Sequence, residues 1–389
     1  MPGVSIGNWY QNQVATGANP STPFSDSDIV TVVQKATAAL GHAPKILMSS
    51  WSPPGYLKST ASTKGGGTLA SAAGAFQYAD FAQWWVNALT QYGSRGVQPD
   101  FITIQNEPDL STNYESCLLD ATEGSNAGFP QALDAVHAAI AASSLSPKPQ
   151  ILAPDPVGIG FNTIQRYLAG VDLGNVGGIG HHLYHGGDSG NDPAPDSFIA
   201  SMAGVAATAA GAGKPTFMTE FQPNVPSIIN TAWMIHNAVV VEGVTAYIYW
   251  PLFWAAPNTG PPIPPVTIET PTATFTTPKG YTLNDIYYVL KHFARWVDSG
   301  WIRVEITSSA TAVKASAFIS PDGNSLTTIL INTDTTPHAI RVASTAFATA
   351  SAAAYRTSGA TERTTPVPVG AGTVVTMPAR SIATVAFTR

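Results

Sequence analysis

The sequence predicts an α/β fold: a (β/α)8-type TIM barrel that lacks its first β/α unit, followed by an all-β side domain. Short apolar runs alternate with helix-length segments between Val4 and Trp250, which is typical of βα units. The runs are apolar at nearly every position, as expected of parallel strands buried on both faces. From Trp301 onward, Val, Thr and Ala alternate between turn signals such as PDGN, which indicates antiparallel strands.

The expected elements follow one another in a regular order. The expected strands are residues 4–8, 45–50, 101–106, 150–155, 178–184, 216–220 and 245–250. The expected helices between them are residues 26–40, 75–93, 128–142, 161–169, 196–212 and 228–242. Successive βα units of about 30–50 residues favour a barrel with one unit missing. A doubly wound open sheet is the alternative, but no glycine-rich phosphate-binding turn follows the first strand.

The composition changes after Trp250. Residues 255–279 contain too much proline for a helix and are long for an ordinary loop. Residues 281–299 have apolar residues at helical spacing and precede Gly300, so we expect a closing helix there. These boundaries predict a barrel domain at residues 1–299 and the all-β domain at residues 300–389.

Charge and composition restrict the class of partner. Charged residues make up only 11% of the chain, the net charge is -6, and no Lys/Arg cluster is present. This argues against nucleic acid and against a membrane surface, and it suits a neutral polar ligand such as a carbohydrate. No apolar run reaches the roughly 18 residues of a transmembrane helix, and no signal peptide is visible. The lone Cys117 is expected to be a small buried apolar residue.

Two carboxylates are the strongest candidates for chemistry. The chain has eight glutamates, and only Glu107 and Glu220 end an apolar strand. In a parallel barrel, functional groups project from the carboxyl ends of the strands. Two carboxylates in one cleft can cleave a glycosidic bond, with one as proton donor and the other as nucleophile or base. Pro108 is expected to hold Glu107 in an extended conformation, and mere capping or salt-bridging of the two is the weaker alternative.

Aromatic and histidine side chains occur at the same strand ends. They are Trp51, His182, Tyr184, Trp250 and, just beyond, Phe253 and Trp254. Aromatic rings stack on the C–H faces of sugars. The cluster GHHLYHG also raises the alternative of a metal site, but its glycines and its strand pattern break helical ligand spacing. We therefore expect His182 to line a cleft and expect no metal.

The motifs, taken in order, resemble glycoside hydrolase family 30. They are SSWSPPGYLKS, GGGTL, QYADFAQWW, ITIQNEPD, ILAPD, GHHLYHG, FMTEF, AYIYW and KGYTLNDIYYVLKHFARWVDSGWIRVE. The resemblance extends from about residue 4 to the C-terminus. It implies a (β/α)8 barrel with a β-sandwich attached to its side, a retaining mechanism and no cofactor.

The resemblance also implies a role for individual residues. Glu107 corresponds to the acid/base, Glu220 to the nucleophile, and Asn106 to the asparagine that binds the sugar 2-hydroxyl. Four further residues fall on cleft-lining positions: Trp51, His182, Tyr184 and Trp250. The segment NEPDLSTNYESC is most similar to the endo-xylanase branches, so the resemblance implies a β-1,4-xylanase, secreted or extracellular, that binds a polysaccharide.

The chain departs from the family pattern in two places. Its motifs begin at the second barrel strand, and an open barrel would leave unpaired strand edges. If Met1 is the true start, the edges beside residues 4–8 and 245–250 are expected to be covered by a loop or by a second protomer in a homodimer. The loop after Trp250 is the other departure, because residues 247–265 contain no Arg or Lys.

That loop bears on which xylan is cut. In the bacterial glucuronoxylan-specific branch, an arginine of this loop pairs with the glucuronate side group, a contact that a guanidinium makes well. Phe253 and Trp254 offer aromatic surface instead, so we predict a xylanase that does not require glucuronate. The alternatives are a β-1,6-glucanase, a β-1,4-glucanase or an exo-acting β-glycosidase of the same family, a non-catalytic carbohydrate-binding protein, and a metal-dependent hydrolase.

Overall fold

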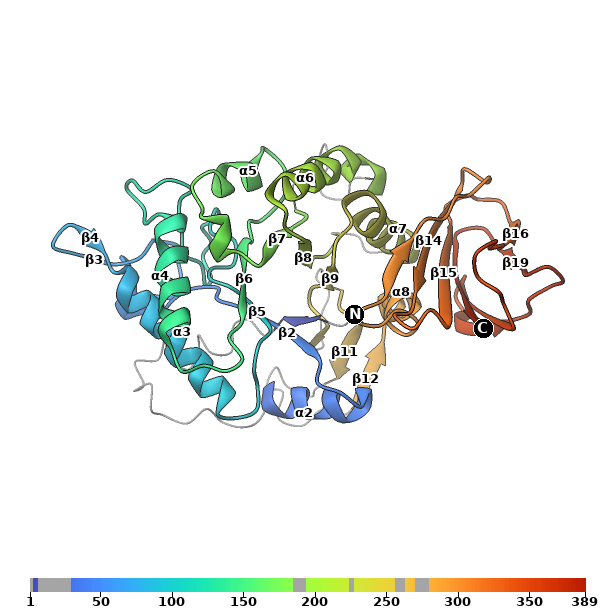
Figure 1. Cartoon of the computed structure of the whole chain (residues 1–389), viewed down its shortest axis with the longest axis horizontal. Helices are drawn as coiled ribbons and strands as arrows, with labels where there is room; N and C mark the ends of the chain where they lie inside the picture. Colours follow the sequence, from blue (N-terminus) through green and yellow to red (C-terminus); the bar gives the residue numbers. More distant parts are fainter. Residues whose placement is uncertain (1–2, 6–28, 185–193, 224–226, 256–262, 270–279) are drawn as a thin grey trace.

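The computed structural model describes residues 3–5, 29–184, 194–223, 227–255, 263–269 and 280–389. Within these ranges a barrel of parallel strands and helices lies beside an antiparallel β domain (Figure 1). Helices α7 (Ile228–Asn237) and α8 (Asp285–Ala294) lie between the two. The predicted α/β barrel with a C-terminal β domain is confirmed.

The barrel sheet has seven parallel strands in the order of the chain. They are β1 (Gly3–Ser5), β2 (Lys45–Ser49), β5 (Phe101–Thr103), β6 (Gln150–Pro154), β7 (Gly178–His182), β8 (Thr216–Phe221) and β9 (Ala246–Tyr249). Each coincides with an expected strand, although residues 6–8 of the first lie outside the described part. The two outermost strands, β1 and β9, approach each other without sharing a hydrogen-bonded ladder. The sheet therefore curves round until its edges are neighbours, and a homodimer through these edges stays a prediction.

The helices follow the strands as predicted. They are α2 (Ile29–Leu40), α3 (Tyr78–Gly93), α4 (Phe129–Ala142), α5 (Thr163–Leu168), α6 (Ile199–Ala212) and α7. Helix α3 shows why: Phe81, Trp84, Trp85, Ala88 and Tyr92 recur at helical spacing, and all are buried against the barrel. No helix among the described residues is both long and apolar enough to cross a membrane.

Several boundaries differ from expectation for local reasons. The segment expected to begin α3 at residue 75 instead forms a hairpin of β3 (Ser71–Ala72) and β4 (Ala75–Phe76). Gly74 has a positive φ of 84° in its turn, which a glycine adopts without strain. The helix expected to reach residue 242 changes to a π-helical turn, Ala238–Glu242, after Asn237. One-turn 3-10 helices occur at Gly55–Leu57, Leu173–Asn175 and Pro195–Phe198.

The prediction for residues 281–299 was wrong at both ends. Strands β10 (Phe253–Ala255), β11 (Val266–Glu269) and β12 (Gly280–Leu283) form a small sheet, so residues 281–283 belong to a strand. Asn284 ends that strand because its amide donates to the Pro264 carbonyl at 2.7 Å, and α8 runs only to Ala294. β12 forms because it pairs with β11, a separate segment of the chain. The helical periodicity of residues 281–299 does not reveal this pairing.

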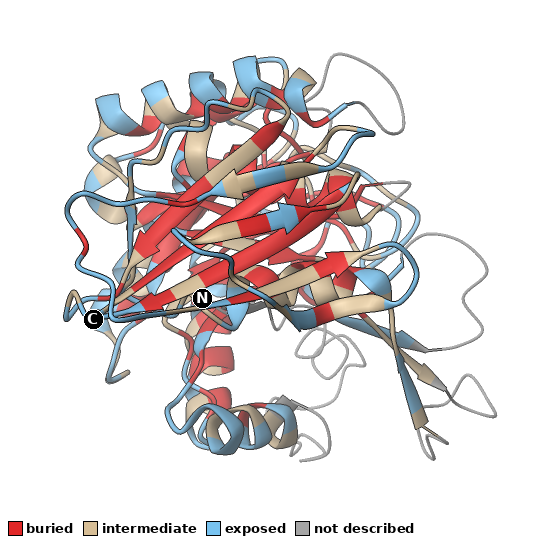
Figure 2. Ribbon diagram, turned by 90° about the vertical axis from the view of Figure 1, so that its right-hand side faces the viewer, coloured by how far each residue is buried: buried red, intermediate tan, exposed pale blue. Residues whose placement is uncertain are grey.

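The C-terminal domain is built from antiparallel sheets. One sheet contains β13 (Ile302–Val304), β14 (Val313–Ile319), β15 (Ser325–Asn332), β20 (Ser381–Thr388), β17 (Ser351–Ser358) and β18 (Glu362–Val367), in that order. Strands β16 (His338–Arg341) and β19 (Val374–Met377) form the second. Buried residues line the central strands (Figure 2). The predicted boundary at residues 299/300 falls between α8 and β13.

One apolar cluster joins the two domains. It is made of Ile229, Ala232 and Ile235 from α7, Val289 from α8, and Phe318, Ile329, Ile331 and Ile382 from the β domain. All of these side chains are buried. Because this cluster spans both domains, burial of apolar surface stabilises their relative arrangement.

Candidate active site

Glu107 follows β5 and lies on the carboxyl side of the barrel sheet. Its backbone has φ 48°, so the extended conformation expected from Pro108 is wrong. The Glu107 N–H donates to the Asp155 carbonyl at 3.0 Å, and its own carbonyl accepts from the Leu110 N–H at 3.0 Å. These two hydrogen bonds hold a left-handed conformation that is unfavourable for a glutamate and that is often found at functional sites.

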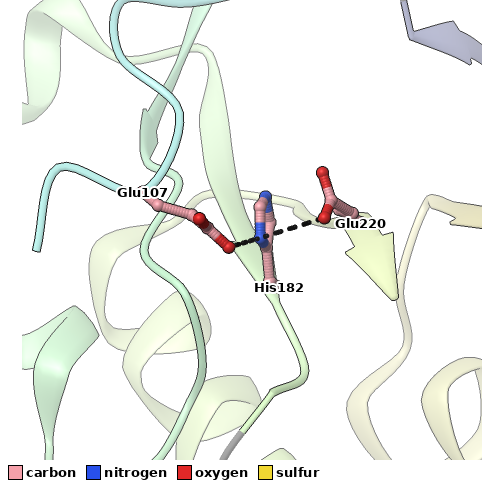
Figure 3. A group of neighbouring side chains, drawn as sticks. All are labelled: Glu107, His182 and Glu220. Atoms are coloured by element: carbon pink, nitrogen blue, oxygen red, sulfur yellow. Dashed lines mark hydrogen bonds and ion pairs between the residues drawn. The ribbon is translucent and has the colours of Figure 1, made fainter. Parts of the chain in front are cut away.

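His182 lies between the two predicted catalytic carboxylates (Figure 3). Its Nδ1 is 3.1 Å from Glu107 Oε1 and 4.0 Å from Glu220 Oε1. The Tyr184 hydroxyl donates to Glu220 Oε1 at 3.3 Å. His182 is 1% exposed, and Glu107 and Glu220 are each 9% exposed. The segments that follow β5, β7 and β8 therefore place two carboxylates, a phenol and an imidazole around one point.

Asp155, at the end of β6, is a member of this group that the sequence reasoning missed. Its Oδ1 lies 3.7 Å from His182 Nε2, on the other side of the ring from Glu107. Ser49 Oγ donates to Asp155 Oδ2 at 3.2 Å, and the Thr219 hydroxyl donates to Oδ1. The signal was present, because the run QILAPD also ends an apolar strand in a carboxylate. The prediction of two catalytic glutamates does not extend to an aspartate in the same kind of position.

The pKa values of these groups follow from burial and from one another. Burial opposes the charge on His182, but the negative charges of Glu220, Glu107 and Asp155 raise its pKa to about 10. Burial raises the pKa of Glu220 to about 7, and the His182 charge opposes that rise. Burial, and then the neighbouring Glu220, also raise the pKa of the Tyr184 phenol, which stays a hydrogen-bond donor. At neutral pH the centre therefore contains an imidazolium.

The same atoms could be taken for a metal site. One ligand atom each from Glu107, His182 and Glu220 lie within 4.8 Å of one another. An imidazole ligand must supply a lone pair, whereas both nitrogens of His182 face carboxylates and its pKa is raised to about 10. A metal ion would have to displace that proton, so the donor set suits a hydrogen-bonded imidazolium better than a metal ligand.

The other histidines of the GHHLYHG motif do not complete a metal site within the described residues. His181 points to the other side of β7, where its Nε2 is 2.6 Å from Glu242 Oε1 and both side chains are fully buried. His185 lies outside the described residues. Cys117 is buried, as predicted.

The predicted substrate-binding residues lie at the same end of the barrel. Asn106 is 4% exposed, and its N–H donates to the Ser50 carbonyl at 2.7 Å. The Trp51 carbonyl accepts from the Gln105 side chain at 2.7 Å, which ties the end of β2 to the chain that enters the Glu107 turn. These bonds keep Asn106 and Trp51 next to Glu107.

Trp250 and Trp254 lie beside Glu220. The Trp250 N–H donates to the Phe221 carbonyl at 3.3 Å, directly after Glu220. The ring of Trp254, on β10, is 6.1 Å from the ring of Trp250 and is 43% exposed. The structure thus brings all eight predicted site residues to one end of the barrel, and their individual roles stay predictions.

Tyr114 is a further aromatic residue near the centre that was not predicted. It is 49% exposed, and its phenol pKa is raised by partial burial and then by the charges of Glu107 and Glu220. Its position in the long segment after Pro108, rather than at a strand end, left no signal in the sequence.

Comparison with known proteins gives two matching family models and a set of relatives. The glycosyl hydrolase family 30 TIM-barrel domain matches residues 24–195, and the family 30 beta sandwich domain matches residues 300–385. Glucuronoxylanase XynC of Bacillus subtilis (strain 168) is 27% identical over 294 residues, which cover 72% of this chain and 58% of the relative. Putative glucosylceramidase 1 of Caenorhabditis elegans is 23% identical over 302 residues, which cover 74% and 55%. The chain therefore spans less than two thirds of the length of these relatives.

Solved structures support the fold. The catalytic domain of GH30 xylanase C from Talaromyces cellulolyticus superposes with a TM-score of 0.73 at 20% identity, covering 100% of this chain and 87% of that chain. SrfJ from Salmonella typhimurium superposes with a TM-score of 0.71 at 18% identity, covering 97% and 76%. Both domains of the chain match one family, and the two matches together cover more than half of it. The chain belongs to glycosyl hydrolase family 30.

Proposed function

We propose that this chain is a retaining glycoside hydrolase with Glu107 as acid/base and Glu220 as nucleophile. The observation that carries the proposal is the spacing of the two carboxyl groups, whose nearest ligand oxygens lie within 4.8 Å of each other. Retaining enzymes need roughly 5–5.5 Å between the carboxyl groups, whereas inverting enzymes need about 6.5–9.5 Å to admit a water. The short spacing supports direct attack on the sugar over activation of a water between the carboxylates.

The proposed reaction has two steps. Glu220, ionised, attacks the anomeric carbon through one oxygen while the other accepts the Tyr184 hydrogen bond. Glu107 gives its proton to the departing glycosidic oxygen. It then takes a proton from the water that releases the sugar from Glu220. The imidazolium of His182, 3.1 Å from Glu107 Oε1 and 4.0 Å from Glu220 Oε1, offsets the negative charge that both carboxylates carry in turn.

We propose β-1,4-xylan as the substrate, cut within the chain and outside the cell, where such polymers occur. Support comes from the xylanases among the similar structures and from the relative named as a glucuronoxylanase. Residues 247–265 contain no Arg or Lys, and Phe253 and Trp254 in that stretch are 41% and 43% exposed. Exposed aromatic rings bind neutral sugars and offer nothing specific to a carboxylate. The proposed xylanase therefore does not require glucuronate side groups.

A β-glucosidase or β-glucanase is the second candidate. It is favoured by the relatives named as putative glucosylceramidases and by the similarity to an endo-beta1,6-glucanase structure, with a TM-score of 0.67. The same two carboxylates would perform the chemistry. Product profiles on unsubstituted xylan, glucuronoxylan, cellulose, a β-1,6-glucan and aryl β-glucosides separate the two candidates.

Substitution of the two carboxylates tests the mechanism. Glu107→Gln and Glu220→Gln are each expected to lower kcat about 10²-fold or more, because each removes a proton donor or a nucleophile. Azide should restore turnover of Glu220→Gly with inversion at the anomeric carbon. Glu115→Gln is the control, since Glu115 follows β5 too but pairs with Lys64 at 3.7 Å. Near-normal turnover in both carboxylate variants would overturn the assignment.

Three further assays decide the finer proposals. A preference for glucuronoxylan above about tenfold in kcat/KM, worth about 1.4 kcal/mol of transition-state binding, would contradict independence of glucuronate. Loss of activity in chelator, restored by a divalent metal, would favour the metal-dependent alternative. Binding of xylan without turnover by the parent enzyme would favour a carbohydrate-binding protein.

A further inference from the structure

Asp155 and Glu107 lie on opposite sides of the His182 ring. The Nδ1 of His182 faces Glu107 Oε1 at 3.1 Å, and its Nε2 faces Asp155 Oδ1 at 3.7 Å. Asp155 is 1% exposed, so its side chain is shielded from solvent. A carboxylate on each side of an imidazole favours the form with a proton on both nitrogens.

The Asp155 side chain is itself held in place from two strands. Ser49 of β2 donates to Oδ2 at 3.2 Å, and Thr219 of β8 donates to Oδ1. On β7, Gly180 lies next to this carboxyl group, since a Cβ built there would be in van der Waals contact with Asp155 Oδ1 at 3.5 Å. The two hydroxyl donors therefore hold the buried Asp155 carboxyl group in a fixed position.

Asp155 also holds the backbone of the acid/base. Its carbonyl accepts the hydrogen bond of the Glu107 N–H at 3.0 Å, and Asp155 and Glu107 both have a positive φ, 65° and 48°. Asp155 therefore contacts Glu107 in two ways, directly through its backbone and indirectly through the His182 ring.

We propose that Asp155 is a positioning residue that acts through His182, keeping this ring doubly protonated and its Nδ1–H directed at the Glu107 carboxylate. The effect of Asp155 on catalysis rests on the proposed function. Its effect on the charge and orientation of the His182 ring does not depend on that function, because both can be measured without substrate.

The contribution of Asp155 to the charge of His182 can be separated from that of the other titratable groups around the ring. The titratable groups that face it from the surrounding elements are Glu107, Asp109, Asp155, His181, Tyr184 and Glu220. Glu107 and Glu220 both face Nδ1 and both change charge or bonding during the reaction. Asp155 alone among the described groups faces Nε2, and it takes no part in the chemistry. It is therefore the constant partner that keeps the second proton on the ring.

The adjacent residue supplies a matched control. His181 on the same strand pairs with Glu242 at 2.6 Å, and both side chains are fully buried. This second histidine–carboxylate pair has similar burial and chemistry, but it faces away from the site. Glu242→Gln therefore removes a buried carboxylate and leaves Asp155, His182 and Glu107 in place.

The first measurement uses the parent enzyme without substrate. Nitrogen-15 NMR of the histidine side chains, with His182→Gln to assign the signals, reports the protons on each ring nitrogen. We expect both nitrogens of His182 to be protonated at pH 8. A neutral ring at pH 8 would overturn the proposal, whatever the variants do.

The second measurement compares Asp155→Asn with Glu242→Gln. Asparagine has nearly the same shape as aspartate and tolerates a positive φ, so the backbone bond to Glu107 can persist. We expect the His182 pKa to fall by roughly one pH unit or more in Asp155→Asn, because one opposite charge near the ring is lost. In Glu242→Gln the His182 pKa should change less than in Asp155→Asn, because Glu242 reaches it only through the charge of His181, although thermal stability falls.

Kinetics provide the final readout. In Asp155→Asn we expect kcat to fall roughly fivefold relative to the parent at pH 10, where the variant ring has lost most of its proton and the parent ring about half. KM should stay within about twofold, and the deficit should shrink toward pH 8, where the variant ring is protonated again. An unchanged His182 pKa in a folded Asp155→Asn, or an equal deficit at both pH values, would overturn the proposal. A parent enzyme that is inactive on all glycans tested, but whose His182 responds as expected, would instead overturn the proposed function.

Discussion

Burial raises the pKa of Glu220, whereas the surrounding carboxylates raise the pKa of His182 against the effect of burial. Three carboxylates, from Glu107, Asp155 and Glu220, surround one imidazolium, and each of the four is at most 9% exposed. Such a group of desolvated like charges is unfavourable for folding and is typical of active sites. The left-handed backbone of Glu107 and Asp155 adds to this cost.

Glu220→Gln is expected to stabilise the fold while it abolishes activity. The folded pKa of Glu220, about 7, lies above its ordinary value of 4.5. As pH rises from 4.5 to 7 the unfolded chain releases this proton first, so the free energy of unfolding falls in the parent and not in the variant. The difference between variant and parent should grow over this window to at most about 3 kcal/mol and stay constant above pH 7.

Urea unfolding at pH 5, 6, 7 and 8 measures that difference. Glu305→Gln, an exposed glutamate of the β domain, is the control and should give a constant difference. A stabilisation of Glu220→Gln that is as large at pH 5 as at pH 8 would contradict a raised Glu220 pKa.

The small sheet of β10, β11 and β12 carries Trp254 close to Trp250. Residues at equal register lie on the same face, so Trp254 and Thr282 share one face with Thr267, and Tyr281 lies with Ile268 on the other. Tyr281 is 69% exposed and Trp254 is 43% exposed, but only the Trp254 ring contacts Trp250. The face that carries Trp254 therefore extends the aromatic surface beside Glu220.

Trp254→Ala is expected to weaken binding of long substrates selectively. Loss of one stacked ring should raise KM for xylohexaose roughly five- to tenfold, corresponding to about 1 kcal/mol, and leave an aryl xylobioside almost unaffected. Tyr281→Ala removes an aromatic ring from the same sheet but from its other face, and should change neither constant. Equal effects of Trp254→Ala on both substrates would place Trp254 next to the reacting bond instead.

The barrel and the β domain share one apolar cluster, so we expect the stability of each domain to depend on the other. Helices α7 and α8 contribute Ile229 and Val289 to a cluster that is completed by Ile329, Ile331 and Ile382. Ile229 lies on the helix that directly follows the strand of Glu220. We therefore expect disruption of the cluster to destabilise the β domain and, through α7, the strand that carries Glu220.

Ile329→Ala is expected to destabilise both domains together. Ile329 is 0% exposed, and truncation to alanine should cost about 2–5 kcal/mol. Calorimetry should show one transition at a lower Tm, with activity lost at the same temperature. Ile302→Ala, on β13 of the same sheet and 62% exposed, should leave Tm nearly unchanged. Two separate transitions, with an active barrel after the first, would show that the domains unfold independently.

Local pattern was enough to predict most of the elements and the two catalytic candidates. Apolar runs and helical periodicity report burial of nearby residues, and a strand end that carries Glu107 or Glu220 is readable without knowing the partner strands. The prediction was wrong at residues 281–283, because β12 is determined by its pairing with β11. It was also wrong for the backbone of Glu107, whose left-handed turn depends on the Asp155 carbonyl.

The sequence by itself determined the alternation of strands and helices, the all-β C-terminal region and the positions of Glu107, His182 and Glu220 at strand ends. Only the tertiary structure decided that Asp155 belongs with them, that His182 lies between carboxylates, and that the Trp254 ring lies near the Trp250 ring. Periodicity records which residues are buried. Charge interactions in a buried site depend instead on distances of a few ångströms between residues far apart in the chain, and only folding sets those distances.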